Sequence, residues 1–527
     1  MSTLHLRVPA LAETQDPDLE TRAVFVEEWV ENLPYADPDT VLQAVLENLQ
    51  QLNKNPVAHG LRIELLERYL APFEFAITVV RQHTPSMSTG SVEKKRAQTD
   101  LSALVAAQLA CGYKLVIAET FNAKGRGRHD LIRAVQRTVA CLCQVMLHGY
   151  HAYRPMPKHI WTELAELYQY AQNHKILDYT PPNSDARSML QYSALELYKA
   201  TLTTSLIDPY QLVHGDVWRV YDFLVQRAVA LRIESLEPVE KPAGVFYVDP
   251  QRDEHPAPLR RLEAVPTQGF FLNTRPLLTS LQRRINEIGQ ASGERLFGSA
   301  QEVEYRFVTR ILDTLGSPPA RQRERDTGAG HLTLTTGLAT AHYFVRTDTD
   351  LRAESGDGEI NLGDVLPGEQ TDFSRHTYAA ELWEQTNRSD AGTGIVRAMR
   401  PNHAINVGDL IGLRSDGALG SSPWSMGVLR WLSITGDGEY RAGIEFLSHN
   451  PSHVALNPHD ADGATEIALR LSAPNDTAIV LVIPKGLYRP GRRLVMDVGG
   501  RTSVLTLASV RESLVHCTVV DAIPDPP

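Results

Sequence analysis

The chain has 527 residues, of which 43% are hydrophobic and 22% charged, and its formal net charge is −11 at pH 7. This length predicts two to four domains, and the acidic excess argues against general binding to nucleic acids or anionic membranes. Because no apolar stretch approaches the roughly 20 residues that cross a bilayer, and residues 1–12 lack a signal pattern, we expect a cytoplasmic protein.

Residues 1–235 are predicted to form an all-α domain. Asp37-Pro-Asp39 offers an N-cap acid, a proline at the first helical position and a second acid in the first turn, and Asp16-Pro-Asp18 repeats this pattern. Further helices are predicted at 159–174, 189–205 and 217–233. Two more apolar stripes are formed by Leu101, Leu104, Val105 and Leu109, and by Leu131, Val135, Val139, Leu142 and Met146. The spacing follows no fixed period, which argues against a repeat protein.

The helical domain contains few candidate chemical groups. The basic stretch 121–129 has Gly-x-Gly beside cations but lacks the Gly-Lys-Ser/Thr ending of a P-loop, so a loop between two helices is favoured over a phosphate site. Cys141 and Cys143 lie two apart on a predicted helix, which fits buried apolar residues better than a zinc or redox site. His148 and His151 have no third candidate ligand nearby in sequence, so no metal site is predicted.

Residues 236–317 are predicted to be a mixed connector that packs on the helical half, because Pro238 and Pro242 interrupt the helical pattern. Its predicted elements are short strands at 245–248 and 269–272, followed by helices at 277–288 and 302–315.

An arginine-rich arm, Arg321-Gln-Arg-Glu-Arg325, follows a proline-rich break at 317–319. Arginine presents a planar fork of donors that grips phosphate and stacks on purine faces. Taken alone, this pattern is more often a solvated surface than a binding site.

A second polar motif is Asn387-Arg-Ser-Asp-Ala-Gly392, which is predicted to be a turn. Asn387 and Ser389 are short side chains that can bond the backbone or a base edge. Gly392 permits a positive φ and the close approach of a ligand. Alone, the motif is an ordinary turn.

Three strand candidates, at 407–413, 424–432 and 440–447, follow this turn. The two motifs, followed by a Gly-Val-x-Arg-Trp strand and a Gly-Ile-Glu-Phe strand, resemble the PilZ family over residues 318–450. The resemblance implies a PilZ-like β-barrel that binds the bacterial second messenger cyclic di-GMP. The implied ligand-binding residues are Arg321, Arg325, Asn387, Ser389 and Gly392, with Arg323 assisting from the same arm.

Sixty-one residues lie between Arg325 and Asn387, more than one or two connecting strands require. Strands are predicted at 331–336 with 341–345, and at 378–385. Between them, residues 347–375 carry eight acidic against two basic side chains and little apolar pattern, which predicts a mobile acidic insertion.

Residues 464–527 are predicted to form a further small β domain. Strand tracts at 479–483, 493–497, 503–507 and 515–520 are consistent with a second barrel beside the first. The cation-rich turn at 488–493 is interpreted as a solvated hairpin rather than a second face of the ligand pocket.

These segments predict a multidomain α+β protein with an all-α N-terminal half, a PilZ-like barrel and a C-terminal β domain. The sequence has no His-Glu-x-x-His, Gly-x-Ser-x-Gly or P-loop motif, which favours a receptor or adaptor without a cofactor over an enzyme. We expect the barrel to sense cyclic di-GMP and the helical half to contact a partner protein. Two alternatives remain: a degenerate PilZ scaffold that binds no nucleotide, and an unrecognised enzyme in the helical half regulated by the barrel.

Overall fold

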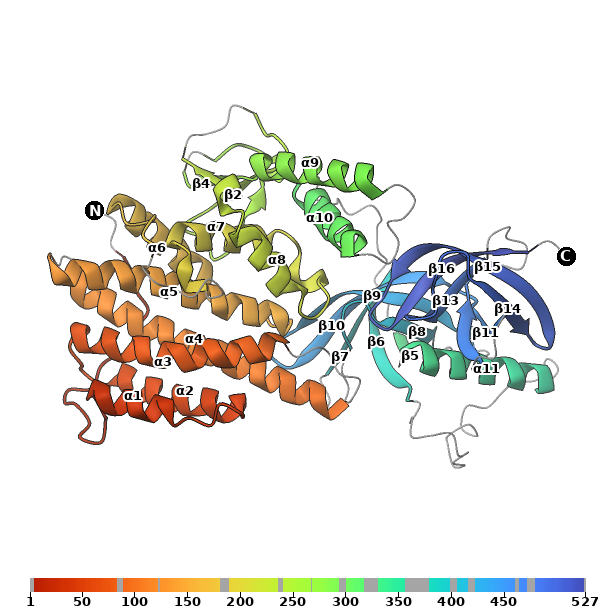
Figure 1. Ribbon diagram of the computed structural model, residues 1–527, viewed down its shortest axis with the longest axis horizontal. Helices are drawn as coiled ribbons and strands as arrows, with labels where there is room; N and C mark the ends of the chain where they lie inside the picture. Colours follow the sequence, from red (N-terminus) through yellow and green to blue (C-terminus); the bar gives the residue numbers. More distant parts are fainter. Residues whose placement is uncertain are drawn as a thin grey trace. The chain divides into compact units, whose positions relative to one another are not determined.

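The computed structural model (Figure 1) divides into two compact units, Met1–Ala320 and Arg321–Pro527. The structure describes all residues except 1–3, 83–88, 122–123, 181–188, 236–239, 267, 293–299, 317–329, 356–378, 399–404, 416–421, 460–463, 472–478 and 526–527.

The first unit is built mainly of helices packed around one apolar core. Its helices are α1 Ala23–Glu31, α2 Pro38–Lys54, α3 His59–Gln82, α4 Thr89–Thr120, α5 Arg126–His151, α6 Ile160–Asn173, α7 Ala194–Ser205 and α8 Asp216–Val225. As predicted, α2 begins with Asp37 at the N-cap and Pro38 at the first helical position. Cys141 and Cys143 are buried in the core, as predicted.

The prediction of a helix at Asp16 is wrong. Asp18 N–H donates to Asp16 Oδ1 at 3.0 Å, so this segment is an Asx turn, and α1 starts only at Ala23. The predicted helix at 217–233 is too long, because α8 ends at Val225 and the chain continues into the 3₁₀ helix Ala228–Ala230 and the strand β1 Arg232–Glu234.

Part of α4 is more apolar than we expected from the sequence. Lys94–Thr120 is long and apolar enough by composition to span a bilayer, with a mean hydropathy of 1.6 over its most apolar window. However, 61% of that window is buried inside the protein. Leu109 and Tyr113 lie in the common core, so α4 has the properties of a central core helix.

The connector belongs to the first unit and packs on the helical half, as predicted. Its elements are β2 Val245–Val248, β3 Ala257–Pro258, β4 Phe270–Asn273, α9 Arg275–Ser292 and α10 Ala300–Gly316. With β1, its strands form one sheet in the order β1-β4-β2-β3. Phe246, Leu272 and Ile311 join the helical core, so the connector and the helices share one hydrophobic interior.

The second unit begins with a closed antiparallel barrel, in the order β10-β7-β6-β5-β8-β9. Its strands are β5 Gly330–Thr336, β6 Glu381–Ser389, β7 Gly392–Ala398, β8 Leu410–Ser415, β9 Ser425–Ile434 and β10 Glu439–Ser448. We call it the first barrel.

The prediction of a strand at 341–345 is wrong, because these residues lie in α11 Leu338–Ser355. Leu338, Ala341 and Val345 are buried and recur at helical spacing, whereas a strand would have buried every second residue. The predicted mobile insertion at 347–375 is therefore helical as far as Ser355, and its remainder lies outside the described residues.

The chain ends in another closed antiparallel barrel, as predicted, in the order β11-β12-β13-β16-β15-β14, but this barrel begins at Ser452 and not at residue 464. Its strands are β11 Ser452–Pro458, β12 Glu466–Arg470, β13 Ile479–Pro484, β14 Arg493–Val498, β15 Arg501–Ser513 and β16 Cys517–Pro524. We call it the C-terminal barrel. Ile479, Leu481 and Ile483 fill its interior, whereas Val480 and Val482 are buried on its outside. Burial on both faces explains the uninterrupted apolar run in β13.

Candidate functional site

A bulge in β6 turns Asn387 toward the outside of the first barrel. Gln385 lies opposite Ile395 of β7, and Asn387 lies opposite Gly394, so the pairing shifts by one residue between them. Ile395 is fully buried, and Gln385 Nε2 donates to the buried Thr393 Oγ1. Residues two apart on a regular strand share a face, so without the bulge Asn387 would point inward as well.

Hydrogen bonds hold Asn387 in this position. Its Oδ1 accepts from the Gly394 N–H at 3.1 Å, and its main-chain carbonyl accepts from Thr393 Oγ1 at 2.8 Å. Its Nδ2 donates to Thr386 Oγ1 at 3.3 Å. The amide is therefore oriented before any ligand arrives, which lowers the entropy lost on binding.

Four residues form a continuous row across the outer face of four strands. Asn387 lies opposite Gly394, Gly394 lies opposite Gly443 of β10, and Gly443 lies opposite Trp431 of β9. We call these residues the glycine row. Because its two central members have no side chains, the amide of Asn387 lies against the backbone of Gly394 and the indole of Trp431 lies against that of Gly443.

Both central positions require glycine for steric reasons. A Cβ added to Gly394 would lie 2.6 Å from Asn387 Nδ2, and a Cβ added to Gly443 would overlap the indole nitrogen of Trp431. The Trp431 indole thus lies directly over Gly443 and remains partly exposed. A partly exposed aromatic ring of this kind is suited to stacking a planar base.

Ser389 and Gly392 form the next row. They pair with each other across the hairpin, and Gly392 also lies opposite Glu445 of β10. The predicted reason for Gly392 is partly wrong, because its φ does not lie in the left-handed region. Glycine is needed there because an added Cβ would overlap the main-chain oxygen of Ile444. The motif is also not a single turn: Asn387 and Ser389 belong to β6, and Gly392 begins β7.

Arg430 pairs with the carboxylate beside Gly392. Its Nε donates to Glu445 Oε2 at 2.6 Å, and its other guanidinium nitrogens bond Glu512 of the C-terminal barrel, with Nη2 to Oε2 at 2.9 Å. An unpaired Glu445 would repel an anionic ligand at this position.

The structure brings together three of the six predicted site residues, namely Asn387, Ser389 and Gly392. Arg321, Arg323 and Arg325 lie outside the described residues. The sequence did not single out Gly394, Gly443 or Trp431 as site residues. The available signal was the Gly-Val-x-Arg-Trp and Gly-Ile-Glu-Phe strands, which supply Trp431 and Gly443.

A buried histidine cluster lies in the helical half. The structure brings His214 against His151, with ring centroids 4.0 Å apart, and His148 packs on Trp218 at 4.9 Å. Burial lowers the pKa of His148 to about 3 and that of His214 to about 4, and it holds the pKa of His151 well below its usual value. The guanidinium of Arg81, over the Trp218 ring, also disfavours protonation of His148 and His151. Within the described part of the chain, no group of three His, Cys, Asp or Glu side chains is placed to hold a metal.

Arginines of the two basic segments noted in the sequence, 121–129 and 488–493, form hydrogen bonds and an ion pair within the protein. The predicted loop at 121–129 is too long, because α5 already begins at Arg126. Arg128, within α5, donates to the His174 carbonyl. In the turn at 488–493, Arg492 Nη1 donates to the Leu487 carbonyl and Arg493 pairs with Asp525.

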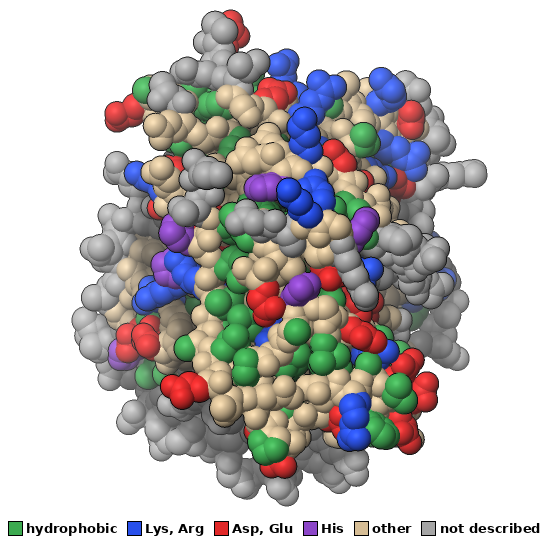
Figure 2. Space-filling model, turned by 90° about the vertical axis from the view of Figure 1, so that its left-hand side faces the viewer, with side chains coloured by type: hydrophobic (Ala, Val, Ile, Leu, Met, Phe, Trp, Pro, Cys, Tyr) green, Lys and Arg blue, Asp and Glu red, His purple; other side chains and the backbone are tan. Residues whose placement is uncertain are grey.

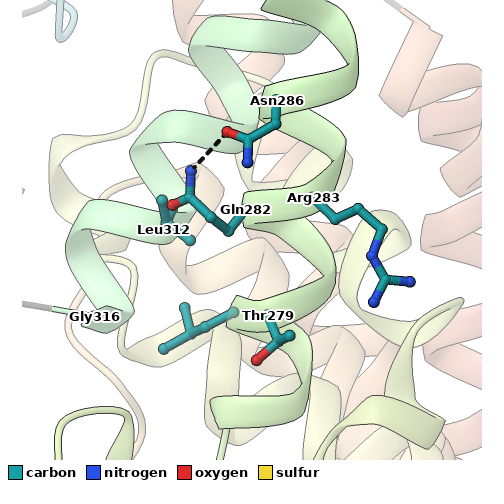
Figure 3. A pocket seen from close by; sticks show the side chains of 7 residues that line it. Thr279, Gln282, Arg283, Asn286, Leu312 and Gly316 are labelled. Carbon is teal, nitrogen blue, oxygen red and sulfur yellow. Dashed lines mark hydrogen bonds between the residues drawn. The ribbon is translucent and has the colours of Figure 1, made fainter.

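A groove of about 590 Å³ lies between α9 and α10. Leu278 and Leu312 supply apolar lining, and Gln282 Nε2 donates to Asn286 Oδ1 at 3.2 Å (Figure 3). The Arg283 side chain extends away from this pair (Figure 3). The two amides therefore satisfy part of each other's hydrogen-bonding capacity within the groove.

One face of the helical half carries side chains of mixed character. Figure 2 shows hydrophobic, basic and acidic side chains interspersed over this face, with several basic side chains gathered in its upper right part. Such a surface has no single charge sign that would attract a polyanion.

Comparison with known proteins connects both halves of the chain to one family. Residues 23–239 match the N-terminal domain of the "Cyclic-di-GMP receptor FimW" family, and residues 245–359 and 363–452 match its "middle PilZ domain". The chain is 22% identical over 497 residues to the cyclic-di-GMP receptor FimW of Pseudomonas aeruginosa, an alignment that covers 84% of this chain and 80% of the relative. The matched middle domain includes the first barrel and its glycine row. The chain therefore belongs to the PilZ-domain family, as a multidomain member with a helical N-terminal half.

Proposed function

We propose that this protein is a receptor for cyclic di-GMP, which binds on the outer face of the first barrel. The observation that carries the proposal is the glycine row, in which a fixed amide and an exposed indole flank two glycines. The name of the similar FimW receptor supports the same ligand.

The residues of this face have distinct roles in the proposal. A guanine base stacks on the Trp431 indole, which itself lies over Gly443. Asn387 and Ser389 offer short polar groups to a base edge or a phosphate oxygen, and Gly392 lets β7 pack closely against β10 beside them. Arg430 keeps Glu445 from repelling the phosphates.

The arginine arm supplies the positive charge in this proposal. Arg321 and Arg325 grip the two phosphates or stack on the bases, and Arg323 assists. Such a local cluster of cations lets an acidic protein bind a dianionic ligand without binding nucleic acids in general.

Calorimetric titration of the intact protein tests the proposal, with cyclic di-GMP, its linear hydrolysis product, cyclic di-AMP and GTP. We expect saturable binding of cyclic di-GMP and much weaker binding of the others. Trp431→Ala should weaken binding by about five- to hundredfold, because base stacking contributes roughly 1–3 kcal/mol, and Trp431→Phe should lie between. If the folded protein binds no cyclic di-GMP, it is a PilZ scaffold without a nucleotide and the proposal is overturned.

We further propose that the helical half contacts a partner protein. It forms its own core and matches a separate family domain, and its sequence contains none of the catalytic motifs sought above. Cross-linking in cells of the organism that produces the protein, compared between cells that contain and cells that lack cyclic di-GMP, tests this idea. Cross-links to one protein that map to residues 23–239 are expected, and cross-links confined to the barrels would contradict it.

A further inference from the structure

The C-terminal barrel has the same strand connectivity as the first barrel. When the six strands of each barrel are numbered in chain order, both barrels close in the order 1-4-5-6-3-2, and all of their pairings are antiparallel. Each strand of one barrel therefore has an equivalent in the other: β12, β13, β16 and β15 correspond to β6, β7, β10 and β9. The matched family domains end at residue 452, where the C-terminal barrel begins.

The two barrels differ in chemistry on the equivalent face. On the first barrel this face carries the glycine row. On the C-terminal barrel the same four strands carry another continuous row, in which neighbouring residues lie directly opposite one another. This row is Leu469, Val482, Val519 and Glu512. Three of its four side chains are apolar, whereas the glycine row consists of an amide, two glycines and an indole.

The apolar row is buried against the first barrel. Leu469, Val482 and Val519 lie outside their own barrel interior and share one cluster with residues of β8, β9 and α11. The members from the first barrel and α11 are Leu338, Ala341, Val345, Leu410, Trp424, Met426 and Val428. A ligand has no access to a face that is covered in this way.

The fourth residue of the apolar row reaches toward the glycine row. Glu512 holds the guanidinium of Arg430, which also bonds Glu445 opposite Gly392. A backbone hydrogen bond from Val515 N–H to the Gly408 carbonyl, at 3.3 Å, joins the barrels at the same junction.

We propose that the C-terminal barrel has the strand connectivity of a PilZ barrel but binds no nucleotide. Its face that corresponds to the glycine-row face of the first barrel is instead the surface on which the first barrel docks. Through Glu512 the C-terminal barrel positions Arg430, which keeps Glu445 paired beside the ligand. This role of Arg430 rests on the proposed binding of cyclic di-GMP, whereas the docking does not.

Hydrogen exchange of the intact protein tests the docking without any nucleotide. Val482→Asp should raise exchange in α11 and β9, because it places a charge in the apolar junction. The control is Val504→Asp, which changes a half-buried valine on the far side of the same barrel. Equal effects of the two variants would overturn the docking role. Because Val482→Asp can fail to fold, Val482→Ala provides a milder variant, for which a smaller increase in the same segments is expected.

Titration with cyclic di-GMP tests two further points: that the C-terminal barrel binds no nucleotide, and that Arg430 acts by pairing with Glu445. The double variant Arg325→Ala/Trp431→Ala should lose all measurable binding of cyclic di-GMP. Binding that remains at wild-type affinity would place a site on the C-terminal barrel and overturn the proposal that this barrel binds no nucleotide. Arg430→Gln should weaken binding by about two- to tenfold at low salt, and by less at high salt.

Adding both Glu445→Gln and Glu512→Gln to Arg430→Gln should restore affinity, since the two changes remove both carboxylates that the loss of Arg430 leaves unpaired. Failure to restore it would mean that Arg430 contacts the ligand itself and would overturn the positioning role. If the wild-type protein binds no nucleotide, the proposed function fails, and the hydrogen-exchange result still decides the docking.

Discussion

Asn387 lies directly opposite Gly394, and its side-chain Oδ1 accepts a hydrogen bond from the Gly394 N–H at 3.1 Å. This bond forms at a bulge, where the regular ladder between β6 and β7 is interrupted. The side chain thus satisfies a backbone donor and is fixed by it. The bulge moves Asn387 to the outside of the barrel and also holds it there.

We expect Gly443→Ala to weaken cyclic di-GMP binding by about tenfold or more, because the new methyl group displaces the Trp431 indole and stacking contributes roughly 1–3 kcal/mol. Calorimetry measures the affinity, and circular dichroism shows that the fold is kept. Gly436→Ala is the matched control, since Gly436 lies between the same two strands and an added Cβ there meets nothing within 4 Å. Equal affinities of the two variants would contradict the role of the glycine row.

Arg321→Ala and Arg325→Ala should each weaken binding by at least about tenfold, because a charge-assisted hydrogen bond contributes roughly 1.5–3 kcal/mol. Arg323→Ala should have a smaller effect. The control is Arg501→Ala, which removes an exposed arginine from the C-terminal barrel. Wild-type affinity of Arg325→Ala would remove that residue from the site.

The sequence predicted part of the site, and the reason for the limit is geometric. Asn387, Ser389 and Gly392 form a local motif that a resemblance can identify. Gly394, Gly443 and Trp431 join them only through the register of four strands, which includes irregularities between Gln385 and Asn387 and between Gly443 and Ile444. A shift of one residue moves a side chain to the opposite face, so composition and periodicity could not place these residues in one row.

Replacement of residues 347–375 by a short Gly/Ser linker should destabilise the second unit, whereas replacement of 356–375 alone should leave stability and affinity nearly unchanged. The first change removes Asp348, which pairs with Arg414 at 3.4 Å where both side chains are largely buried. Loss of such a pair costs about 1–3 kcal/mol, but loop length alone costs little. Thermal unfolding of both variants measures the difference, and equal midpoints would show that α11 needs no residue after Arg346.

The fold was predictable where one pattern dominated. Alternating and continuous apolar runs identified most strands of both barrels, including 479–483, but they did not identify β7, β11 or β12. The strand prediction for 341–345 was wrong because five residues are too few to distinguish the periodicity of a helix from that of a strand. Only Leu338, which precedes this run, extends the helical spacing. The prediction of a helix start at Asp16 was wrong because an aspartate before a proline is as compatible with a turn as with a helix N-terminus.

Acidification should destabilise the helical half through its buried histidines. The folded protein keeps His148, with a pKa of about 3, and His214, with a pKa of about 4, neutral, whereas unfolded histidine titrates near 6.5. Below about pH 6.5 the unfolded chain therefore binds more protons, so the free energy of unfolding falls as pH decreases, by up to about 1.4 kcal/mol per pH unit for each histidine. The loss continues until pH reaches the folded pKa.

Replacing His148 isolates this contribution. Neither ring nitrogen of His148 has a hydrogen-bond partner among the described residues, so His148→Leu breaks no such bond and should leave the protein at least as stable at pH 7.5. Between pH 7 and pH 5 its free energy of unfolding should fall less steeply than that of the wild type. Urea titrations followed by circular dichroism at several pH values measure both slopes. His5→Gln changes an exposed histidine and should keep the wild-type slope; if His148→Leu also keeps it, protonation of His148 does not limit the acid stability of the helical half.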